Sequence, residues 1–333
     1  MAGRTHRVPE LDITPMDQRP TLRSLVIANL GMVVMIMMWG SFFPLLEFLL
    51  KTWDPMSATI GRHFLAVVTL LAVLTLRERV VPIHGRLPWR HLWYLGLIGM
   101  TLSSILTTLG VHFSSGVSAA IVAATNPITS AITARLVQRL PLMPGIIVGT
   151  VLSTAGGLIA SFDSPDMSAT AGGLGIRGGE LLMIGANVAF TWYSIMAQHW
   201  LRGYSQLHIT GLTSFSGLVG LAVVWLAASW SGLNSVHLDF GWANVVIIIY
   251  MGSLSVGLGN FLWNFGVSRT GVVVASMYGN LIPIVAVLIT LIWMGTPPSA
   301  GQMIGGLLII GGVLYAQLMT LRAARGNQAA GAA

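Results

Sequence analysis

Polar side chains follow single helical faces within stretches of the sequence that are otherwise apolar. Around residues 178–198, four of them occupy the i, i+4, i+7 and i+11 positions of one helical face: Asn187, Thr191, Ser194 and Gln198. Around residues 242–265 the same spacing recurs: Ser253, Gly257, Asn260 and Asn264. Hydroxyl and carboxamide groups can bind a small polar solute, and they can equally hydrogen-bond one helix to the next. For the pattern as a whole we favour a polar path through a helical bundle.

Aromatic side chains occur at mid-depth in the same stretches, where the interfacial belt of a membrane protein would not place them. A cavity that combines rings with amides and hydroxyls suits a small amphipathic solute. The candidate cavity residues are Trp39, Phe43, Ser104, Thr108, Asn126, Asn187, Trp192, Asn260, Asn264, Tyr278 and Asn280. Trp39 and Trp192 are the preferred rings because the two halves of the chain match there. Lipid contact and core filling are the alternatives for each ring.

Two prolines interrupt apolar stretches near their middle. Pro127 and Pro283 each remove a backbone donor and free the carbonyl four residues earlier, at Ala123 and Gly279. This pattern predicts a hinge that bends as a cavity opens to alternate sides, with the freed carbonyls available to an ammonium group. A static kink is the alternative, because membrane helices tolerate proline.

Charged side chains are sparse inside the apolar stretches. A charge at mid-bilayer costs about 2.5–3.5 kcal/mol on insertion scales, so Arg62 is expected to snorkel or to pair. Glu47 lies near the same predicted external face, and the two are expected to form an outer ion pair with a structural role. The chain has no cysteine, no H-E-x-x-H spacing and no phosphate-binding loop. We therefore predict no catalytic residue, no metal, no cofactor and no ATPase subunit; the chain is not expected to be an enzyme.

Ten apolar stretches must position these side chains. The chain is 54% hydrophobic and only 8% charged, whereas ordinary soluble domains carry about 25% charged residues. A helix of about 20 apolar residues crosses a hydrocarbon core of about 30 Å. The stretches cover approximately residues 25–50, 55–76, 92–111, 117–139, 144–162, 178–198, 208–230, 242–265, 271–294 and 300–321. The sequence thus predicts an all-α integral membrane protein with ten transmembrane helices in contact with a lipid bilayer.

The net charge of +7 indicates orientation and not nucleic-acid binding. Most of the Lys and Arg residues lie in alternate loops, and cytoplasmic loops are the ones enriched in these residues. Both termini are therefore expected in the cytoplasm of a bacterial cell, with the chain in its inner membrane. Residues 1–24 and 322–333 form the predicted cytoplasmic tails, and residues 163–177 form a predicted external linker.

The two halves of the chain repeat one another. Shifting the sequence by 156 positions brings helix breakers and glycines into coincidence: Gly96/Gly252, Gly110/Gly266, Pro127/Pro283, Pro141/Pro297, Gly145/Gly301, Gly149/Gly305 and Gly156/Gly312. The predicted repeats span 25–162 and 178–321. Five helices in each half make the second copy cross the membrane in the opposite direction, and such inverted repeats bind their solute near the midplane where the copies meet.

The segments Trp39-Gly40-Ser41 and Asn126-Pro127-Ile128, with the run that begins at Gly116 and the glycine-rich fifth and tenth stretches, resemble the EamA-type drug/metabolite transporter superfamily. The resemblance covers about residues 25–321 and is closest to bacterial YddG-type aromatic amino acid exporters. It implies a basket of ten helices whose cavity is lined mainly by the first, third, fourth, sixth, eighth and ninth. It also implies that the fifth and tenth serve packing.

The expected function is secondary transport that exports small amphipathic metabolites, aromatic or neutral amino acids first, by alternating access. A polyphosphate or sugar nucleotide would need several cations inside, and only Arg62 is available. Other neutral metabolites or drugs are the alternative substrates, and an intramembrane enzyme or a scaffold is the less favoured class. The spacings Gly145-x-x-x-Gly149 and Gly301-x-x-x-Gly305 favour close helix packing, within the chain or in a weak homodimer; a monomer is equally expected.

Overall fold

Apolar runs form helices throughout the part of the chain that the structure describes. The computed structural model describes residues 22–78, 87–113, 126–139, 142–162, 179–282, 285 and 300–331, and no strand occurs among them. The elements follow in this order: α1 (Leu22–Leu49), α2 (Pro55–Glu78), α3 (Trp89–Tyr94), η1 (Leu95–Leu102), α4 (Ser103–Phe113), α6 (Asn126–Gln138), α7 (Pro144–Phe162), α9 (Gly179–Trp200), α10 (Gln206–Trp230), α11 (Trp242–Tyr250), η2 (Met251–Leu258), α12 (Gly259–Thr270), α13 (Val272–Tyr278), η3 (Gly279–Leu281) and α15 (Ala300–Gly331).

Within these ranges, seven helical segments are long and apolar enough to cross a membrane: Arg23–Leu49, Pro55–Leu76, Trp89–Phe113, Leu181–Trp200, Gln206–Trp230, Trp242–Thr270 and Met303–Ala323. Their outer faces carry large apolar side chains, such as Leu30, Val223 and Leu307, that are more than half exposed. Lipid accommodates such a surface, whereas soluble monomers seldom expose large apolar patches. The fourth predicted stretch includes residues 117–125, and the ninth includes residues 283–284 and 286–294; these lie outside the described residues, so the count of ten remains a prediction.

Two π-helical segments interrupt the third and eighth predicted stretches at matching positions. Leu95–Leu102 and Met251–Leu258 lie 156 residues apart, and each joins a preceding α-helix directly to a following one. A π-helix has i→i+5 hydrogen bonds, so it holds more residues per turn than an α-helix and rotates the side chains beyond it. The prediction from α-helical spacing did not include this rotation.

The halves of the chain pack on each other reciprocally. A Cβ added at Gly96 in η1 would collide with the backbone of α10 at Gly217, and one added at Gly252 in η2 would collide with the backbone of α2 at Arg62. Glycine thus permits each π-helix to approach a helix of the other half. The pattern continues where Gly110 of α4 meets Met183 of α9. Likewise, Gly266 of α12 meets Met32 of α1.

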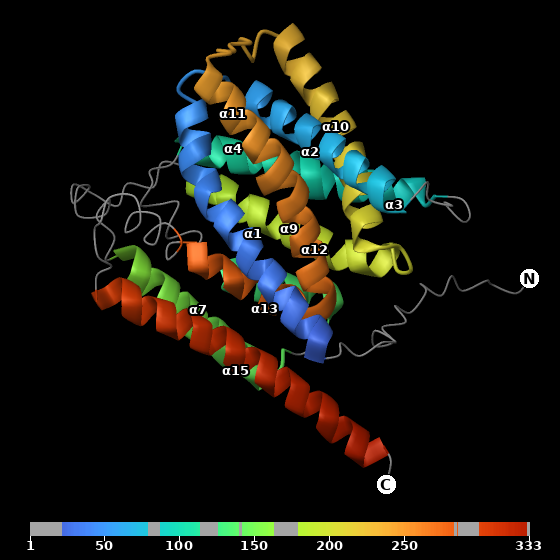
Figure 1. Ribbon diagram of the computed structural model, residues 1–333, viewed down its shortest axis with the longest axis vertical. Helices are drawn as coiled ribbons and strands as arrows, with labels where there is room; N and C mark the ends of the chain where they lie inside the picture. Colours follow the sequence, from blue (N-terminus) through green and yellow to red (C-terminus); the bar gives the residue numbers. More distant parts are fainter. Residues whose placement is uncertain are drawn as a thin grey trace, which may run out of the picture.

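Helices α7 and α15 form a glycine-based pair that lies along one edge of the molecule (Figure 1). A Cβ at Gly149 would lie 2.6 Å from the Gly312 carbonyl oxygen, and one at Gly156 would lie 2.5 Å from the Gly305 carbonyl oxygen. Small residues let membrane helices approach to backbone contact, where van der Waals packing holds them together. The glycines therefore serve packing within the chain, which leaves less of this face for the homodimer that the sequence allowed.

Asp54 lies in the turn between α1 and α2 and joins this turn by hydrogen bonds to the loop before α11. Its carboxylate accepts hydrogen bonds from the backbone N–H of Ser57 (2.8 Å) and of His237 (3.0 Å), and its own N–H donates to the His237 carbonyl (3.0 Å). Burial alone would raise the pKa of Asp54, but the hydrogen bonds from Ser57 and His237 hold this pKa below its ordinary value. The ionised form is thus the one that the fold stabilises.

We expect Asp54→Ala to lower the free energy of unfolding by about 1–2 kcal/mol, because α2 loses its N-cap. Since the folded-state pKa is lowered, the stability that Asp54 contributes is complete above about pH 4 and declines as the pH falls through the folded value. Thermal unfolding of the detergent-purified protein between pH 3 and 7 measures both effects. Asp54→Ser keeps the cap but loses the hydrogen bond from the His237 N–H, so its melting temperature should lie between those of the parent and the alanine variant. Equal melting temperatures at pH 7 for the parent and the alanine variant would contradict this role.

Candidate functional site

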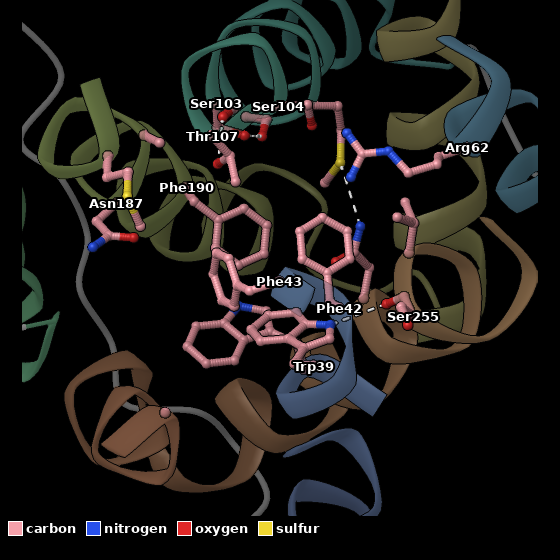
Figure 2. Close-up of a pocket in the computed structure, with 18 of the residues that line it drawn as sticks. Trp39, Phe42, Phe43, Arg62, Ser103, Ser104, Thr107, Asn187, Phe190 and Ser255 are labelled. Carbon is pink, nitrogen blue, oxygen red and sulfur yellow. Dashed lines mark hydrogen bonds between the residues drawn. The ribbon is translucent and has the colours of Figure 1, made fainter. Parts of the chain in front are cut away.

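The described helices form a partly open cavity of about 170 Å³ (Figure 2). Its lining comes from α1, α2, η1 with α4, α6, α9, η2 with α12, and η3. These elements belong to both halves of the chain. Helix α2 contributes Arg62 and His63, although the resemblance had not included the second span in the lining.

Three aromatic rings form one wall of the cavity. Trp39 stacks on Trp263 with ring centroids 5.5 Å apart, and Phe190 meets Trp39 at 6.0 Å and Trp263 at 5.5 Å. The indole N–H of Trp39 donates to the carbonyl of Ser255 in η2 (3.0 Å), and that of Trp263 donates to the Ser194 hydroxyl (2.8 Å). Both indoles are thus held in fixed orientations by the helices of the second half, and their faces form an apolar surface.

The opposite side of the cavity presents hydroxyl groups (Figure 2). Ser103, Ser104 and Thr107 all line it from α4. The Ser104 hydroxyl lies 3.0 Å from His63 Nε2, and His63 Nδ1 lies 3.0 Å from the Thr59 carbonyl oxygen. Because a carbonyl can only accept, Nδ1 carries the proton. His63 is buried beside the Arg62 cation, which favours the neutral imidazole, and in that form Nε2 accepts from the Ser104 hydroxyl.

Arg62 is the cation of the cavity, and Glu47 is not its partner. Arg62 is only 2% exposed, whereas Glu47 is exposed, and no ion pair joins them. Arg62 instead donates to the Thr108 hydroxyl (2.7 Å) and the Ala58 carbonyl (3.0 Å). The expected outer ion pair is absent because Arg62 extends inward to neutral acceptors and Glu47 extends outward.

The structure brings six of the candidate residues into the lining: Trp39, Phe43, Ser104, Asn126, Asn187 and Asn260. Asn260 has little hydrogen bonding of its own, since the one contact of its amide N–H₂ among the described residues is the Met100 sulfur at 3.8 Å. The Asn126 carboxamide accepts a long bond from Ser130 (3.4 Å). These amides retain capacity to bind a solute.

Five other candidates lie outside the lining, and four of them form hydrogen bonds with neighbouring helices. Asn264 donates to Tyr193 (2.8 Å), and Asn280 donates to the Ser153 carbonyl (2.8 Å). Tyr278 donates to Asn29 (2.9 Å), and Thr108 is committed to Arg62. For these four residues the helix-to-helix alternative describes what the structure shows. Trp192 packs edge-on against Trp200 of the same helix, α9, with centroids 5.6 Å apart, and both rings pack against a buried apolar cluster, which is the core-filling alternative.

Only one of the two expected hinge prolines lies among the described residues. Pro127 is buried in the first turn of α6, directly after residues 114–125, and Pro283 lies outside the described residues. Gly279, whose carbonyl Pro283 was expected to free, lines the cavity from η3. The hinge role therefore remains a prediction.

The sequence did not predict several lining residues, of which Phe190 and Ser255 are the most instructive. Phe190 lies three residues after Asn187 on the same helical face, so spacing alone could have found it. Ser255 lies within η2, where the wider turn displaces the lining away from Ser253 and Gly257.

The lining positions of the two π-containing stretches correspond to one another. Gly99, Met100, Ser104 and Thr107 line the cavity from the first half, and the residues 156 positions later do so from the second: Ser255, Val256, Asn260 and Trp263. Among the described residues, no group of three or more His, Asp or Glu side chains is placed to hold a metal ion. The site is thus suited to binding a molecule between two equivalent helical surfaces.

Comparison with known proteins agrees with this architecture. The model of the EamA-like transporter family matches residues 26–162 and 177–317. An uncharacterized transporter of Bacillus subtilis, YyaM, is 27% identical over 83% of this chain and 89% of its own length. A probable terminal-alkyne amino-acid exporter of Streptantibioticus cattleyicolor is 24% identical over 87% of this chain and 93% of its own.

A solved crystal structure superposes with a TM-score of 0.71 at 20% identity, covering 90% of this chain and 99% of that one, which shows a shared fold. The family and the relatives named above are transporters, which speaks against the enzyme alternative. The chain belongs to the EamA-like transporter family and is a multi-pass membrane transporter of the drug/metabolite superfamily.

Proposed function

We propose that the chain exports small amphipathic metabolites, aromatic or neutral amino acids first, by alternating access through the central cavity. The observation that carries this proposal is the composition of the cavity. A wall formed by Trp39, Phe190 and Trp263 faces hydroxyl groups and one cation. An aromatic or apolar side chain fits the wall, and the polar end of the same molecule finds hydrogen-bond partners opposite it.

The alternating-access part of the proposal rests on the relation between the halves. Lining positions recur after 156 residues, and each π-helix packs on a helix of the other half. Two such units that cross the membrane in opposite directions can exchange roles, so that the cavity opens first to one side and then to the other. We include in the proposal ten helices as inverted repeats, cytoplasmic termini and an inner-membrane location.

The amino acid substrate is supported by the resemblance to amino acid exporters and by one distant relative whose name gives that activity. Other neutral metabolites or drugs would use the same cavity, and a panel of solutes separates them. We propose that the chain acts without an ATPase subunit or nucleic acid, as a monomer or a weak homodimer in the bilayer.

Counterflow in liposomes tests the proposal. Vesicles that contain the purified protein and an excess of unlabelled amino acid should accumulate labelled phenylalanine, tryptophan or threonine transiently, and protein-free vesicles should not. The same panel with and without a pH gradient separates facilitated diffusion from proton exchange. Accumulation equal to the passive leak for the whole panel would refute amino acid transport. Exchange of another neutral solute in that case would support the alternative substrates.

A further inference from the structure

Arg62 is buried at the cavity without an acidic partner. Its Nε donates to the Ala58 carbonyl (3.0 Å), and its Nη2 donates to the hydroxyls of Thr108 (2.7 Å) and Thr59 (3.4 Å). A guanidinium has five N–H donors. The two donors on Nη1 have no hydrogen bond to any residue that the structure describes. Figure 2 shows the guanidinium directed from α2 toward the pocket.

The described acidic side chains do not neutralise this charge. Among the residues that the structure describes, the cavity lining contains neither Asp nor Glu. Glu47 is exposed, and the Asp54 carboxylate already accepts hydrogen bonds from the backbone N–H groups of Ser57 and His237. His63, the adjacent titratable group, is engaged on both ring nitrogens by neutral partners, Thr59 and Ser104. The described part of the lining thus carries one formal charge, which is positive.

An uncompensated cation with little water around it interacts strongly with an anion that enters its surroundings. An ammonium group in the same cavity would be repelled by Arg62 and would find only neutral acceptors. The guanidinium also lies over the ring of Phe42, 4.9 Å from its centroid. The anion-binding group and the apolar surface of the cavity are therefore adjacent.

We propose that Arg62 binds the carboxylate of the substrate, so that this cavity selects monocarboxylates with an aromatic or large apolar group and does not require an amino group. The inference rests on the proposed function, because it assigns the substrate class of the same cavity. The hydroxyls of Thr59 and Thr108 hold one edge of the guanidinium and leave Nη1 for the carboxylate oxygens. Arg62 then has a ligand role where the sequence suggested a structural one.

The test is isothermal titration calorimetry of the full chain in detergent with three probes of similar shape: 3-phenylpropionate, L-phenylalanine and 2-phenylethylamine. We expect both carboxylates to bind and the amine to bind at least about tenfold more weakly, because charge-assisted hydrogen bonds contribute at least this factor. Arg62→Gln should lower the affinity for both carboxylates by at least about tenfold, and Arg62→Lys should restore part of this affinity.

Arg269→Gln is the matched control, because Arg269 also lies over a phenylalanine ring, at 5.1 Å, but not in the cavity lining. This variant should bind the carboxylates like the parent. Equal affinity of the parent for amine and carboxylates, or no binding of any probe, would overturn the inference. So would a folded Arg62→Gln protein that keeps the parent's affinity. If Arg62→Gln does not fold, the relative affinities of the parent for the three probes still test the inference.

Counterflow with the same probes separates this inference from the proposed function. Carboxylate binding that depends on Arg62, without exchange in liposomes, would leave the assignment of Arg62 standing and refute transport. Exchange of phenylalanine by a protein that binds the amine equally well would leave transport standing and refute the assignment.

Discussion

Trp39→Ala is expected to reduce the affinity for labelled phenylalanine in the counterflow assay by about 30-fold. The indole forms part of the aromatic wall with Trp263 and Phe190, and its N–H is fixed on the Ser255 carbonyl. An aromatic ring buries about 150–250 Å², and roughly half of that surface meets a bound solute. At about 25 cal/mol per Å² the loss is about 2–3 kcal/mol, and the stated factor corresponds to the lower end of this range.

Two variants make this prediction specific. Trp39→Phe keeps a ring but loses the hydrogen bond to Ser255, so its affinity should be intermediate. Trp192→Ala removes an indole that packs on Trp200 outside the cavity, and its affinity should match that of the parent. Asn126→Ala removes an amide of the lining and should also lower transport without loss of membrane expression. Parent-like transport by both Trp39→Ala and Asn126→Ala would show that these site assignments are wrong.

Gly312→Leu is expected to separate α15 from α7 and to lower the melting temperature in detergent by several degrees. A Cβ at Gly312 would lie 2.7 Å from the Gly149 carbonyl oxygen and 3.0 Å from the Ser153 amide nitrogen. Backbone atoms cannot move aside as a flexible side chain can, so the helices must part along their contact. Overpacking of a tight core costs about 1–3 kcal/mol and at times more.

Gly311 supplies the control for this substitution. It is the preceding residue of α15, and a Cβ there has no atom within 4 Å. Gly311→Leu adds the same side chain and the same gain in helix propensity without a collision. Its melting temperature should equal or exceed that of the parent. A similar loss in both variants would indicate that added bulk, and not the α7–α15 contact, causes the effect.

Hydrophobic pattern alone located the helices that the structure describes. The predicted stretch at 178–198 corresponds to α9, Gly179–Trp200, and the stretch at 208–230 corresponds to α10, Gln206–Trp230. Apolar length dictates these elements, because a buried or lipid-facing backbone must satisfy its own hydrogen bonds. Local sequence therefore carries this level of the fold.

The side chains that reach the cavity depend on features that local spacing does not carry. Within η2 the wider π-helical turn changes which side chains face inward, so Ser255 lines the cavity where Ser253 and Gly257 were expected. Whether an asparagine is free or bound depends on its neighbours: Asn260 meets only a sulfur atom, whereas Asn264 is held by Tyr193. Such partners lie far away in sequence, and only the packed structure reveals them.

The pairing of Trp39 with Trp192 illustrates an error of register. Met32 and Met183 make equivalent contacts, with Gly266 and Gly110 respectively. Seven residues after each methionine come Trp39 and Phe190, and these two rings meet in the cavity. Phe190, and not Trp192, is therefore the structural counterpart of Trp39. Without a gapless match in this region, sequence comparison aligned the two tryptophans by residue type.

Helices α7 and α15 hold each other at backbone distance, yet none of their described residues contributes to the cavity lining. Substitutions that alter which solute is accepted can thus accumulate on the inner helices while this pair stays unaltered. Because the two sets of residues are separate, proteins with this fold can evolve a different solute specificity while the α7–α15 contact continues to stabilise the fold. A designer could exploit it by randomising only the inward-facing positions.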